Sequence, residues 1–387
     1  MRPFRPALLA VSVAALAACS DQGPVATAPV SAGPAPLLAA SGRAIEGSYV
    51  VVLKPGADPR SVAAAAGVSP RFVYAAALSG FAAELNQGQL AALRHNPAVE
   101  YVEPDQVMTA ATTQSGATWG IDRIDQRNLP LSGTYTYTAT ASSVRAYVLD
   151  TGLQPGHPEF EGRAQSVYNA ISGETADDCN GHGTHVAGTV GSKTYGVAKK
   201  AQLRGVKVLN CSGSGSTSGI IAGVDWVRAN AQKPAVANLS LGGAYSASLN
   251  TAVDNLASSG VFVAVAAGNS NADACNYSPA SAASAYTTAA SNSDDTRRST
   301  SNYGSCVDGF APGGSITSTW LNGGTSTISG TSMASPHVAG VAALYKATYG
   351  DAASSTIDTW IKNNSTTGVV KNVPSGTPNR LLYKAGL

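Results

Sequence analysis

Three side chains, far apart along this sequence, have the types that nucleophilic acyl transfer requires. Asp150 follows a run of apolar residues, His182 lies in the glycine-rich stretch NGHGTH, and Ser332 lies among small residues in ISGTSMASPHVAG. A serine hydroxyl becomes a nucleophile when an imidazole takes its proton and a carboxylate orients that imidazole and stabilises its cation. Singly, each residue is more typical of a turn, a loop or a helix cap. Together they predict a hydrolase with an Asp-His-Ser triad.

The chain order of the three residues and the neighbours of Ser332 narrow the class of hydrolase. The order Asp, His, Ser is one of three unrelated orders that build the same geometry. The stretch Gly330-Thr331-Ser332-Met333-Ala334 lacks the G-x-S-x-G pattern, which disfavours a lipase or esterase of the α/β-hydrolase fold. A binding module that has lost its activity and a surface-anchored structural lipoprotein are the non-enzymatic alternatives. We expect an enzyme, because a pseudo-enzyme would usually lack one of the three catalytic residue types and all three are present.

Buried strands and helices alternate in the part of the chain that carries these residues. Near-continuous apolar runs predict the strands, and patterns of helical period lie between them. The predicted strands cover residues 144–150, 203–209, 235–241 and 261–268, and the predicted helices cover 183–190, 218–231 and 248–260. This alternation is typical of an α/β fold with a parallel sheet covered by helices on both faces. Functional residues gather at the carboxyl ends of such strands, where Asp150 lies.

A smaller α+β unit is predicted ahead of that domain, over residues 45–107. Its strands and helices follow the order βαββαβ, which is the ferredoxin-like arrangement. Its first strand ends at Pro55, Asp58 caps and Gly67 ends its first helix, and Ser79-Gly80 separates two strands. This fold by itself indicates no function.

Three motifs in this order resemble those of the subtilisin-like serine proteases. VLDTG around Asp150, GHGTHVAG around His182 and GTSMASPHVAG around Ser332 match the catalytic motifs of that family. The sequence between them is most similar to the proteinase K branch, in particular to aqualysin-type enzymes, and the match extends almost continuously from Thr112 to the last residue. Residues 45–107 resemble the inhibitor-like propeptide of the family. The resemblance implies a secreted serine endopeptidase, made as a zymogen that its propeptide inhibits and helps to fold.

The resemblance also implies roles for residues outside the triad. The side chain of Asn269 would donate a hydrogen bond to the oxyanion, beside the backbone N–H of Ser332. Small residues would line the pocket for the side chain before the scissile bond, and another segment would pair with the substrate backbone as an added strand. The pocket residues are Ser240, Leu241, Gly242, Ala266, Ala267 and Gly268, and the pairing residues are Gly213, Ser214 and Gly215. This roomy, uncharged pocket predicts a broad preference for hydrophobic or aromatic side chains.

Two structural calcium sites are implied in the same way. One site combines a carboxylate with two backbone carbonyls, and the other gathers two carboxylates, an amide and a hydroxyl. The first set is Asp308 with the carbonyls of Ala283 and Ala285, and the second is Asp122, Asp125, Gln126 and Ser132. Oxygen ligands of this kind suit Ca²⁺, although exposed acids near turns are also common without a metal.

Four of the five cysteines lie in the catalytic region, where export makes disulfides the expected state. These are Cys179, Cys211, Cys275 and Cys306, which allow three pairings. Pairing of neighbours would close two loops of about 30 residues, each stabilising the fold by roughly 3 kcal/mol. A zinc site formed by Cys179, His182 and His185 is the alternative, but its spacing matches no usual zinc pattern.

The N-terminus predicts export. Arg2 and Arg5 precede a short apolar run, and Leu16-Ala17-Ala18-Cys19 resembles a bacterial lipoprotein signal, in which the cysteine is acylated. Ordinary signal cleavage after Ala17 or Ala18, with no role for Cys19, is the alternative. Acylation of Cys19 would tether the precursor to a membrane surface, and cleavage near Ala111–Thr112 would release the catalytic domain.

Four segments are therefore expected along the chain. They are a signal peptide (1–19), an Ala/Pro-rich linker (20–41), the inhibitor-like propeptide (42–111) and the catalytic domain (112–387). Only 12% of the residues are charged and the net charge is +2, so no basic surface for nucleic acid is evident. No apolar stretch reaches the length of a membrane span. We expect a monomer whose partners are protein or peptide substrates and its own propeptide.

Overall fold

The computed structural model describes residues 33–40, 43–108 and 111–387, which divide into two compact units. The smaller unit comprises the described residues up to Ala39 and Gly47–Glu103, and the larger comprises the described residues of Ala40–Glu46 and of Pro104–Leu387. The predicted signal peptide with Cys19 and most of the predicted linker lie outside the described residues. No helix within those ranges is long and apolar enough to cross a membrane.

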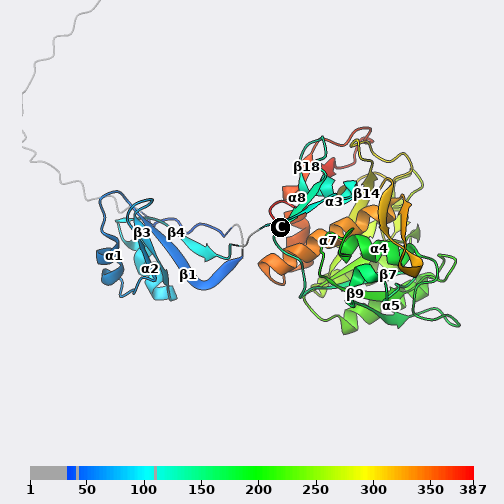
Figure 1. Cartoon of the computed structure of the whole chain (residues 1–387), viewed down its shortest axis with the longest axis horizontal. Coiled ribbons are helices and arrows are strands. Elements are labelled where there is room, and N and C mark those ends of the chain that lie inside the picture. Colours follow the sequence, from blue (N-terminus) through cyan, green and yellow to red (C-terminus); the bar gives the residue numbers. More distant parts are fainter. Residues whose placement is uncertain (1–32, 41–42, 109–110) are drawn as a thin grey trace, which may run out of the picture. The chain divides into compact units, whose positions relative to one another are not determined.

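The smaller unit has the predicted order βαββαβ (Figure 1). Its sheet has the order β2-β3-β1-β4, and β3 pairs antiparallel with both of its neighbours. The elements are β1 (Ala44–Leu53), α1 (Pro59–Ala65), β2 (Phe72–Tyr74), β3 (Gly80–Glu84), α2 (Gln87–His95) and β4 (Val99–Gln106). Asp58 caps α1 by accepting a hydrogen bond from the N–H of Ser61, as the sequence predicted.

Part of the segment predicted to be a linker instead packs against the smaller unit. The N–H of Leu38 donates to the carbonyl of Val102 on β4, and the side chain of Arg94 donates to the carbonyl of Ala35. Ala35 also joins the buried core of this unit. β4 is the last strand of its sheet and offers unpaired backbone groups, which even an uncharged Ala/Pro-rich stretch can satisfy.

A nine-stranded sheet forms the centre of the larger unit (Figure 1). Its order is β18-β19-β15-β14-β12-β10-β7-β9-β8, and every pair is parallel except β18 with β19. The strands are β7 (Arg145–Asp150), β8 (Ala164–Asn169), β9 (Gln202–Lys207), β10 (Ala235–Leu239), β12 (Phe262–Ala266), β14 (Tyr286–Ser291), β15 (Gly309–Pro312), β18 (Thr366–Thr367) and β19 (Arg380–Leu381). The four strands predicted from apolar runs are β7, β9, β10 and β12.

Helices cover both faces of this sheet, as predicted. The helices α4 (His182–Gly191) and α7 (Thr331–Tyr349) pack on one face, and α5 (Thr217–Asn230) and α6 (Ala247–Ser258) pack on the other. Successive strand residues point to opposite faces, so Val148 of β7 joins the core with α4 and α7, whereas Leu149 joins the core with α5 and α6. Because both faces are covered, the strands are apolar at almost every position.

Shorter elements complete the larger unit. The helices are α3 (Trp119–Asp125) and α8 (Ser354–Asn364), and the two-stranded pairs are β5 (Thr112–Ser115) with β6 (Thr134–Tyr137), β11 (Gly243–Ala244) with β13 (Tyr277–Ser278), and β16 (Ile316–Thr319) with β17 (Thr325–Ile328). The long helix α7 is buried over most of its length and packs against β10, β12, β14 and β15.

Candidate active site

His182 and Asp150 are joined by a hydrogen bond. Asp150 is the last residue of β7 and is fully buried, and His182 is the first residue of α4. Nδ1 of His182 lies 2.7 Å from Oδ1 of Asp150, which also accepts the N–H of Thr151 at 2.8 Å. Burial lowers the pKa of His182, but the charge and the hydrogen bond of Asp150, together with the charge of Asp178, outweigh this and raise the pKa. With Nδ1 bound to Asp150, Nε2 is the ring nitrogen left to exchange a proton with a substrate or a nucleophile.

Ser332 is the second residue of α7 and is partly exposed. Its hydroxyl donates to the carbonyl of Ser240 at 3.1 Å, and the hydroxyl of Ser240 donates to the carbonyl of Ser332 at 2.7 Å. The hydrogen bond of Ser332 is therefore made to the residue that follows β10, and not to His182. The helices that begin beside His182 and Ser332 pack directly against each other. Catalytic hydrogen bonds in substrate-free enzymes often form only in the complex.

Close backbone contacts explain the glycines around His182. A Cβ atom on Gly183 would lie 2.0 Å from the carbonyl oxygen of Gly152. Gly181 has φ +104°, and a Cβ there would lie 2.4 Å from the indole of Trp320. The turn after Asp150 and the start of α4 therefore touch through their backbones, and only glycine permits this approach.

Asn269 presents its amide nitrogen beside the start of α7. Its Oδ1 accepts hydrogen bonds from the N–H of Thr331 at 2.9 Å and from the Thr331 hydroxyl at 3.2 Å, which leaves Nδ2 as the group that can donate. A Cβ on Gly330 would lie 3.3 Å from this Nδ2, so a glycine keeps the space beside it open. The N-cap residue of α7, Gly330, has no side chain to cap the helix, so the positive end of α7 and the N–H of Ser332 can serve an anion.

Two cavities adjoin these side chains. The smaller has a volume of about 220 Å³, is lined by Asn269 and Ser332 among others, and has no charged residue among those that line it. The larger has a volume of about 690 Å³ and is lined by His182, and both cavities share Leu241 and Gly242. Every residue predicted to bind substrate lines one or both of them, namely Gly213, Ser214, Gly215, Ser240, Leu241, Gly242, Ala266, Ala267 and Gly268.

A buried acid that the sequence analysis did not single out connects the same segments. Asp178 accepts hydrogen bonds from the hydroxyls of Thr151 and Thr184 and from the backbone N–H groups of Asn180, Gly181 and Thr184. The hydroxyl of Thr151 in turn accepts the N–H of Gly183. Asp178 thus fixes the turn after β7 to the first turn of α4. An acid four residues ahead of a helix start was the available signal, because carboxylates stabilise helix N-termini.

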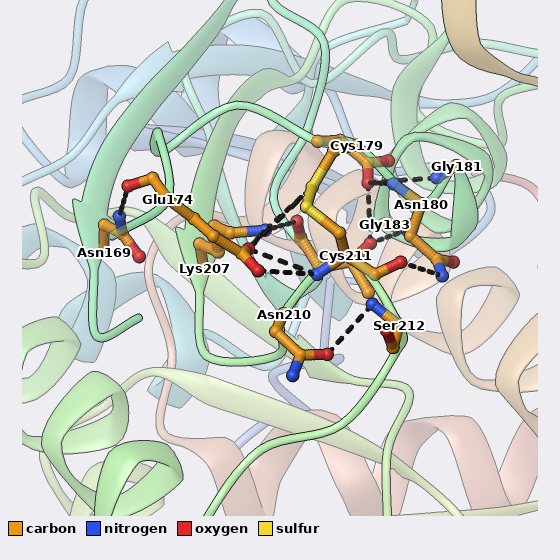
Figure 2. Close-up of a disulfide and its surroundings, with 12 residues drawn as sticks. Asn169, Glu174, Cys179, Asn180, Gly181, Gly183, Lys207, Asn210, Cys211 and Ser212 are labelled. Atoms are coloured by element: carbon orange, nitrogen blue, oxygen red, sulfur yellow. Dashed lines mark hydrogen bonds and ion pairs between the residues drawn. A yellow bond between two sulfur atoms is a disulfide. The ribbon is translucent and has the colours of Figure 1, made fainter. Parts of the chain in front are cut away.

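The cysteines form two disulfides, Cys179–Cys211 and Cys275–Cys306, which is the neighbour pairing. The first disulfide joins the loop that precedes His182 to the segment that leads to Gly213 (Figure 2). Among the described residues, the only group of three or more acids, cysteines and histidines close enough to share a metal is Glu174, Cys179 and Cys211, and both sulfurs are in the disulfide.

The zinc alternative is therefore wrong. Cys179 has no free thiol, and His185 is buried with Nε2 on the carbonyl of Ile316. Burial lowers the pKa of His185 to about 4, so this imidazole is neutral and is part of the buried core.

The residues predicted for the first calcium site do not fit a metal ion. Oδ1 of Asp308 lies 2.8 Å from the ammonium of Lys362, a residue of α8. Lys362 also lines the same cavity as Ala283 and Ala285, whose carbonyls were expected to complete the site. A lysine thus neutralises the carboxylate on which the prediction depended.

The second calcium set does fit, because oxygen atoms from three of its four residues converge and the fourth lies on the same helix face as one of them. Oδ1 of Asp122 accepts both the N–H and the hydroxyl of Ser132, and the same N–H also donates to Oε1 of Gln126. Asp125 lies three residues after Asp122 on α3, on the same helix face, and burial raises its pKa. Two carboxylates, an amide oxygen and a hydroxyl are the ligand types that Ca²⁺ prefers.

Comparison with known proteins identifies the family. The subtilase family model matches residues 143–382, and the model of the peptidase inhibitor I9 matches residues 61–111. An extracellular serine proteinase of Thermus sp. (strain Rt41A) is 50% identical over 97% of this chain and 98% of its own. Proteinase R of Parengyodontium album is 48% identical over 90% and 92% of the two chains.

A solved structure agrees with these matches. The crystal structure of a cold adapted subtilisin-like serine proteinase is 53% identical to this chain, with a TM-score of 0.68 over 70% of this chain and 99% of its own. The parallel sheet, its two helical layers and the preceding small domain are therefore those expected from the three sequence motifs. The chain belongs to the subtilase family and is a subtilisin-like serine proteinase with an I9 inhibitor propeptide.

Proposed function

We propose that this protein is an exported serine endopeptidase that cleaves protein substrates with Asp150, His182 and Ser332. The hydrogen bond between His182 and Asp150 carries the proposal, because it fixes the imidazole with Nε2 available as the base. For attack, the Ser332 hydroxyl leaves the carbonyl of Ser240 and gives its proton to Nε2 while Oγ adds to the peptide carbonyl. His182 then returns the proton to the leaving amine, and water hydrolyses the acyl-enzyme by the same steps.

The oxyanion of the tetrahedral intermediate is stabilised by Asn269 and the start of α7. Nδ2 of Asn269 and the backbone N–H of Ser332 donate to it, and the positive end of α7 adds a favourable field. The hydrogen bonds from Thr331 to Oδ1 support this role, since they hold the amide with its donor side free. Donors that are oriented before the reaction need no reorganisation when the charge develops.

The smaller cavity takes the side chain that precedes the scissile bond. Its lining consists mostly of small residues and has no charge, which supports a broad hydrophobic or aromatic preference. Gly213–Gly215, on the wall of the larger cavity, pair with the backbone of an extended substrate as an added strand. A peptide panel should show no strict requirement for Arg or Lys at this position.

Export and maturation follow from the N-terminal part of the chain. The relative from Thermus sp. that is named an extracellular serine proteinase supports secretion through the predicted signal, with Cys19 as the proposed lipidation site of the precursor. The I9 match ends at residue 111, and Thr112 begins β5, which pairs with β6 in the larger unit. Self-cleavage near Ala111–Thr112 therefore releases a monomeric catalytic domain. Intact mass and N-terminal sequencing of the secreted product test lipidation and the cleavage point together.

One structural calcium ion is proposed at Asp122, Asp125, Gln126 and Ser132. The ion would supply positive charge that offsets the repulsion between the two carboxylates on α3. The chain's own residues keep the arrangement in place, since Gly133 and Ser132 donate hydrogen bonds to Asp122.

Casein hydrolysis by the full chain and by Ser332→Ala tests the proposed function. Wild-type protein should process itself and hydrolyse casein, and a serine-directed phosphonate should block the hydrolysis. Ser332→Ala should remain the full-length precursor. Processing of Ser332→Ala at the same site would show that another protease performs it, and casein hydrolysis by this variant would contradict the assignment of the nucleophile.

A further inference from the structure

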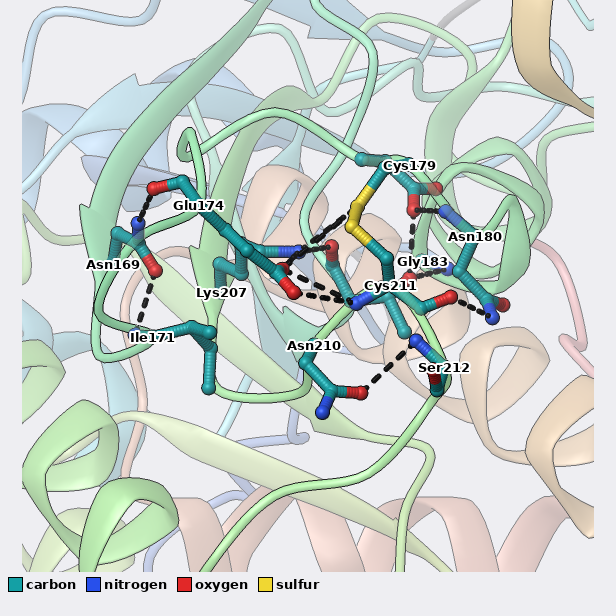
Figure 3. Close-up of polar contacts among 12 residues, drawn as sticks. Asn169, Ile171, Glu174, Cys179, Asn180, Gly183, Lys207, Asn210, Cys211 and Ser212 are labelled. Carbon is teal, nitrogen blue, oxygen red and sulfur yellow. Dashed lines mark hydrogen bonds and ion pairs between the residues drawn. A yellow bond between two sulfur atoms is a disulfide. The ribbon is translucent and has the colours of Figure 1, made fainter.

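A fully buried lysine joins three segments behind the active site. Lys207 is the last residue of β9, and its side chain is 0% exposed. Its ammonium donates to the carbonyl of Thr151 at 2.7 Å, lies 3.1 Å from Oε2 of Glu174, and lies 3.6 Å from Sγ of Cys179 (Figure 3). The three partners come from the turn after Asp150, from the loop after β8, and from the loop that leads to α4. One cation therefore holds together segments that the chain supplies separately.

Glu174 extends these contacts to the segment that carries the substrate-pairing residues. Both of its carboxylate oxygens accept the N–H of Cys211, at 3.2 and 3.1 Å. The Glu174 carbonyl accepts the side-chain amide of Asn169 at 2.8 Å, which fixes the loop to the end of β8. Figure 3 shows the carboxylate of Glu174 between the ammonium of Lys207 and the backbone of Cys211.

A second set of contacts returns from Cys211 to the catalytic histidine. The Cys211 carbonyl accepts the side-chain amide of Asn180 at 2.9 Å, and Oδ1 of Asn180 accepts the N–H of His182 at 3.3 Å. The disulfide between Cys179 and Cys211 runs beside this path. The hydrogen bonds thus form a closed circuit that includes the turn after Asp150, the start of α4 and the residues just ahead of Gly213.

A buried ion pair of this kind is a poor source of stability, since the cost of removing both charges from water offsets most of their attraction. It does restrict geometry, because an ammonium and a carboxylate must each be satisfied by fixed partners. We propose that Glu174 and Lys207 are positioning residues that set the location of Gly213–Gly215 relative to His182 and thereby determine how extended peptides bind. This inference rests on the proposed role of Gly213–Gly215 in pairing with substrate.

Loss of the pair should affect long substrates selectively. In Lys207→Met the Thr151 carbonyl loses its donor, and Glu174, which is 25% exposed, turns toward water and releases the N–H of Cys211. Substrate backbone that lies along Gly213–Gly215 then meets a less ordered wall. A substrate that occupies only the smaller cavity does not contact these residues.

The experiment compares two substrates in five proteins. The substrates are a tetrapeptide p-nitroanilide with a hydrophobic residue before the scissile bond and the ester of a single acylated hydrophobic amino acid. The proteins are wild type, Lys207→Met, Glu174→Gln, Glu174→Ala and a control, Lys200→Met, which removes the cation of the exposed pair between Lys200 and Glu161. For Lys207→Met, KM of the tetrapeptide should rise about tenfold, equivalent to ~1.4 kcal/mol, whereas its kcat and the ester kinetics should change less than twofold.

Glu174→Gln and the control help to distinguish a positioning role from a purely structural one. Glu174→Gln keeps an oxygen for the N–H of Cys211, so its KM should rise less than that of Glu174→Ala, and Lys200→Met should resemble wild type. A lowered Tm with unchanged KM for both substrates, or an equal change for both, would overturn the inference in favour of a purely structural role. If Lys207→Met is not recovered as folded protein, the comparison of Glu174→Ala with Glu174→Gln decides.

The proposed function is checked separately in the same samples. Phosphonate labelling of Ser332 in the wild type supports the proposed serine protease activity, and absence of labelling would contradict the proposed function itself. Intact labelling in every variant, together with an unchanged ratio of tetrapeptide to ester KM, would reject only the positioning role of Glu174 and Lys207.

Discussion

Replacing Asp150 by asparagine tests the most tightly held part of the active site. Oδ1 of Asp150 accepts Nδ1 of His182 at 2.7 Å and the N–H of Thr151 at 2.8 Å, and Oδ2 has no hydrogen-bond partner among the described residues. An asparagine of the same shape can therefore keep both bonds through its amide oxygen. The substitution removes the negative charge and preserves much of the geometry, so it isolates the electrostatic contribution of Asp150.

The expected loss of rate follows from the distance. Two unit charges 2.7 Å apart attract each other by about 6 kcal/mol at an effective dielectric constant of ~20, and this is an upper bound because both charges are spread over several atoms. The attraction exists only once His182 has become an imidazolium, so it lowers the barrier and not the energy of the free enzyme. We expect kcat of Asp150→Asn to fall by about 10³–10⁴-fold, with KM nearly unchanged.

The pH profile is a second, independent test of the role of Asp150. Burial lowers the pKa of His182, and the wild-type pKa is raised only because the charge and hydrogen bond of Asp150, with help from Asp178, outweigh burial. Removing the Asp150 charge should lower this pKa. In the proposed mechanism His182 acts as a base when neutral, so the acid limb of kcat/KM should move to lower pH in the variant.

The assay follows tetrapeptide hydrolysis between pH 4 and 10, a range of about three units on either side of neutrality. Self-processing needs a single turnover, so the slow variant still matures during a long incubation. Asp225→Asn, which changes an exposed acid on α5, is the matched control and should behave like wild type. A kcat within tenfold of wild type, or an acid limb that moves to higher pH, would refute the role assigned to Asp150.

Three further predictions concern the surroundings of the triad. Asn269→Ala should lower kcat by about 10²–10³-fold with little change in KM, as removal of an oxyanion donor does in a related subtilisin; a KM effect alone would contradict this. Asp178→Asn should lower the pKa of His182 and shift the acid limb of kcat/KM to lower pH, since the Asp178 charge contributes to raising that pKa; an unchanged profile would leave Asp178 with a structural role only. A chelator should lower the Tm of wild type and of Asp308→Asn but leave Asp122→Asn unaffected, as differential scanning calorimetry can measure; a chelator effect that persists in Asp122→Asn would place the ion elsewhere.

The sheet and the position of its functional edge were predictable, because the signals for them lie in short stretches of the sequence. Strands such as β7 and β12 are covered on both faces, so their sequences are apolar at nearly every position and are easily recognised. Asp150 stands where such a run ends, and the glycines around His182 reflect a contact so close that other residues are excluded. These signals need no knowledge of distant partners.

Features that depend on partners distant in sequence could not be predicted. Lys207 lies within the strand predicted over residues 203–209, where its sequence neighbours indicate no partner, and only the fold places Glu174 and the Thr151 carbonyl around its ammonium. Lys362 likewise reaches Asp308 from a helix more than 50 residues later in the chain, which no pattern near Asp308 could reveal. Charged side chains carry little positional information until their counter-ions are known.

The burial of α7 has a consequence for the cell that makes this enzyme. This helix seats Ser332 and packs against β10, β12, β14 and β15, all of which emerge from the ribosome before it. Ser332, the proposed nucleophile, reaches its place only when this late segment has packed against the strands made before it. Because α7 begins at residue 331 of 387, the nascent polypeptide lacks that residue, and therefore harms no protein of its host, for most of its synthesis.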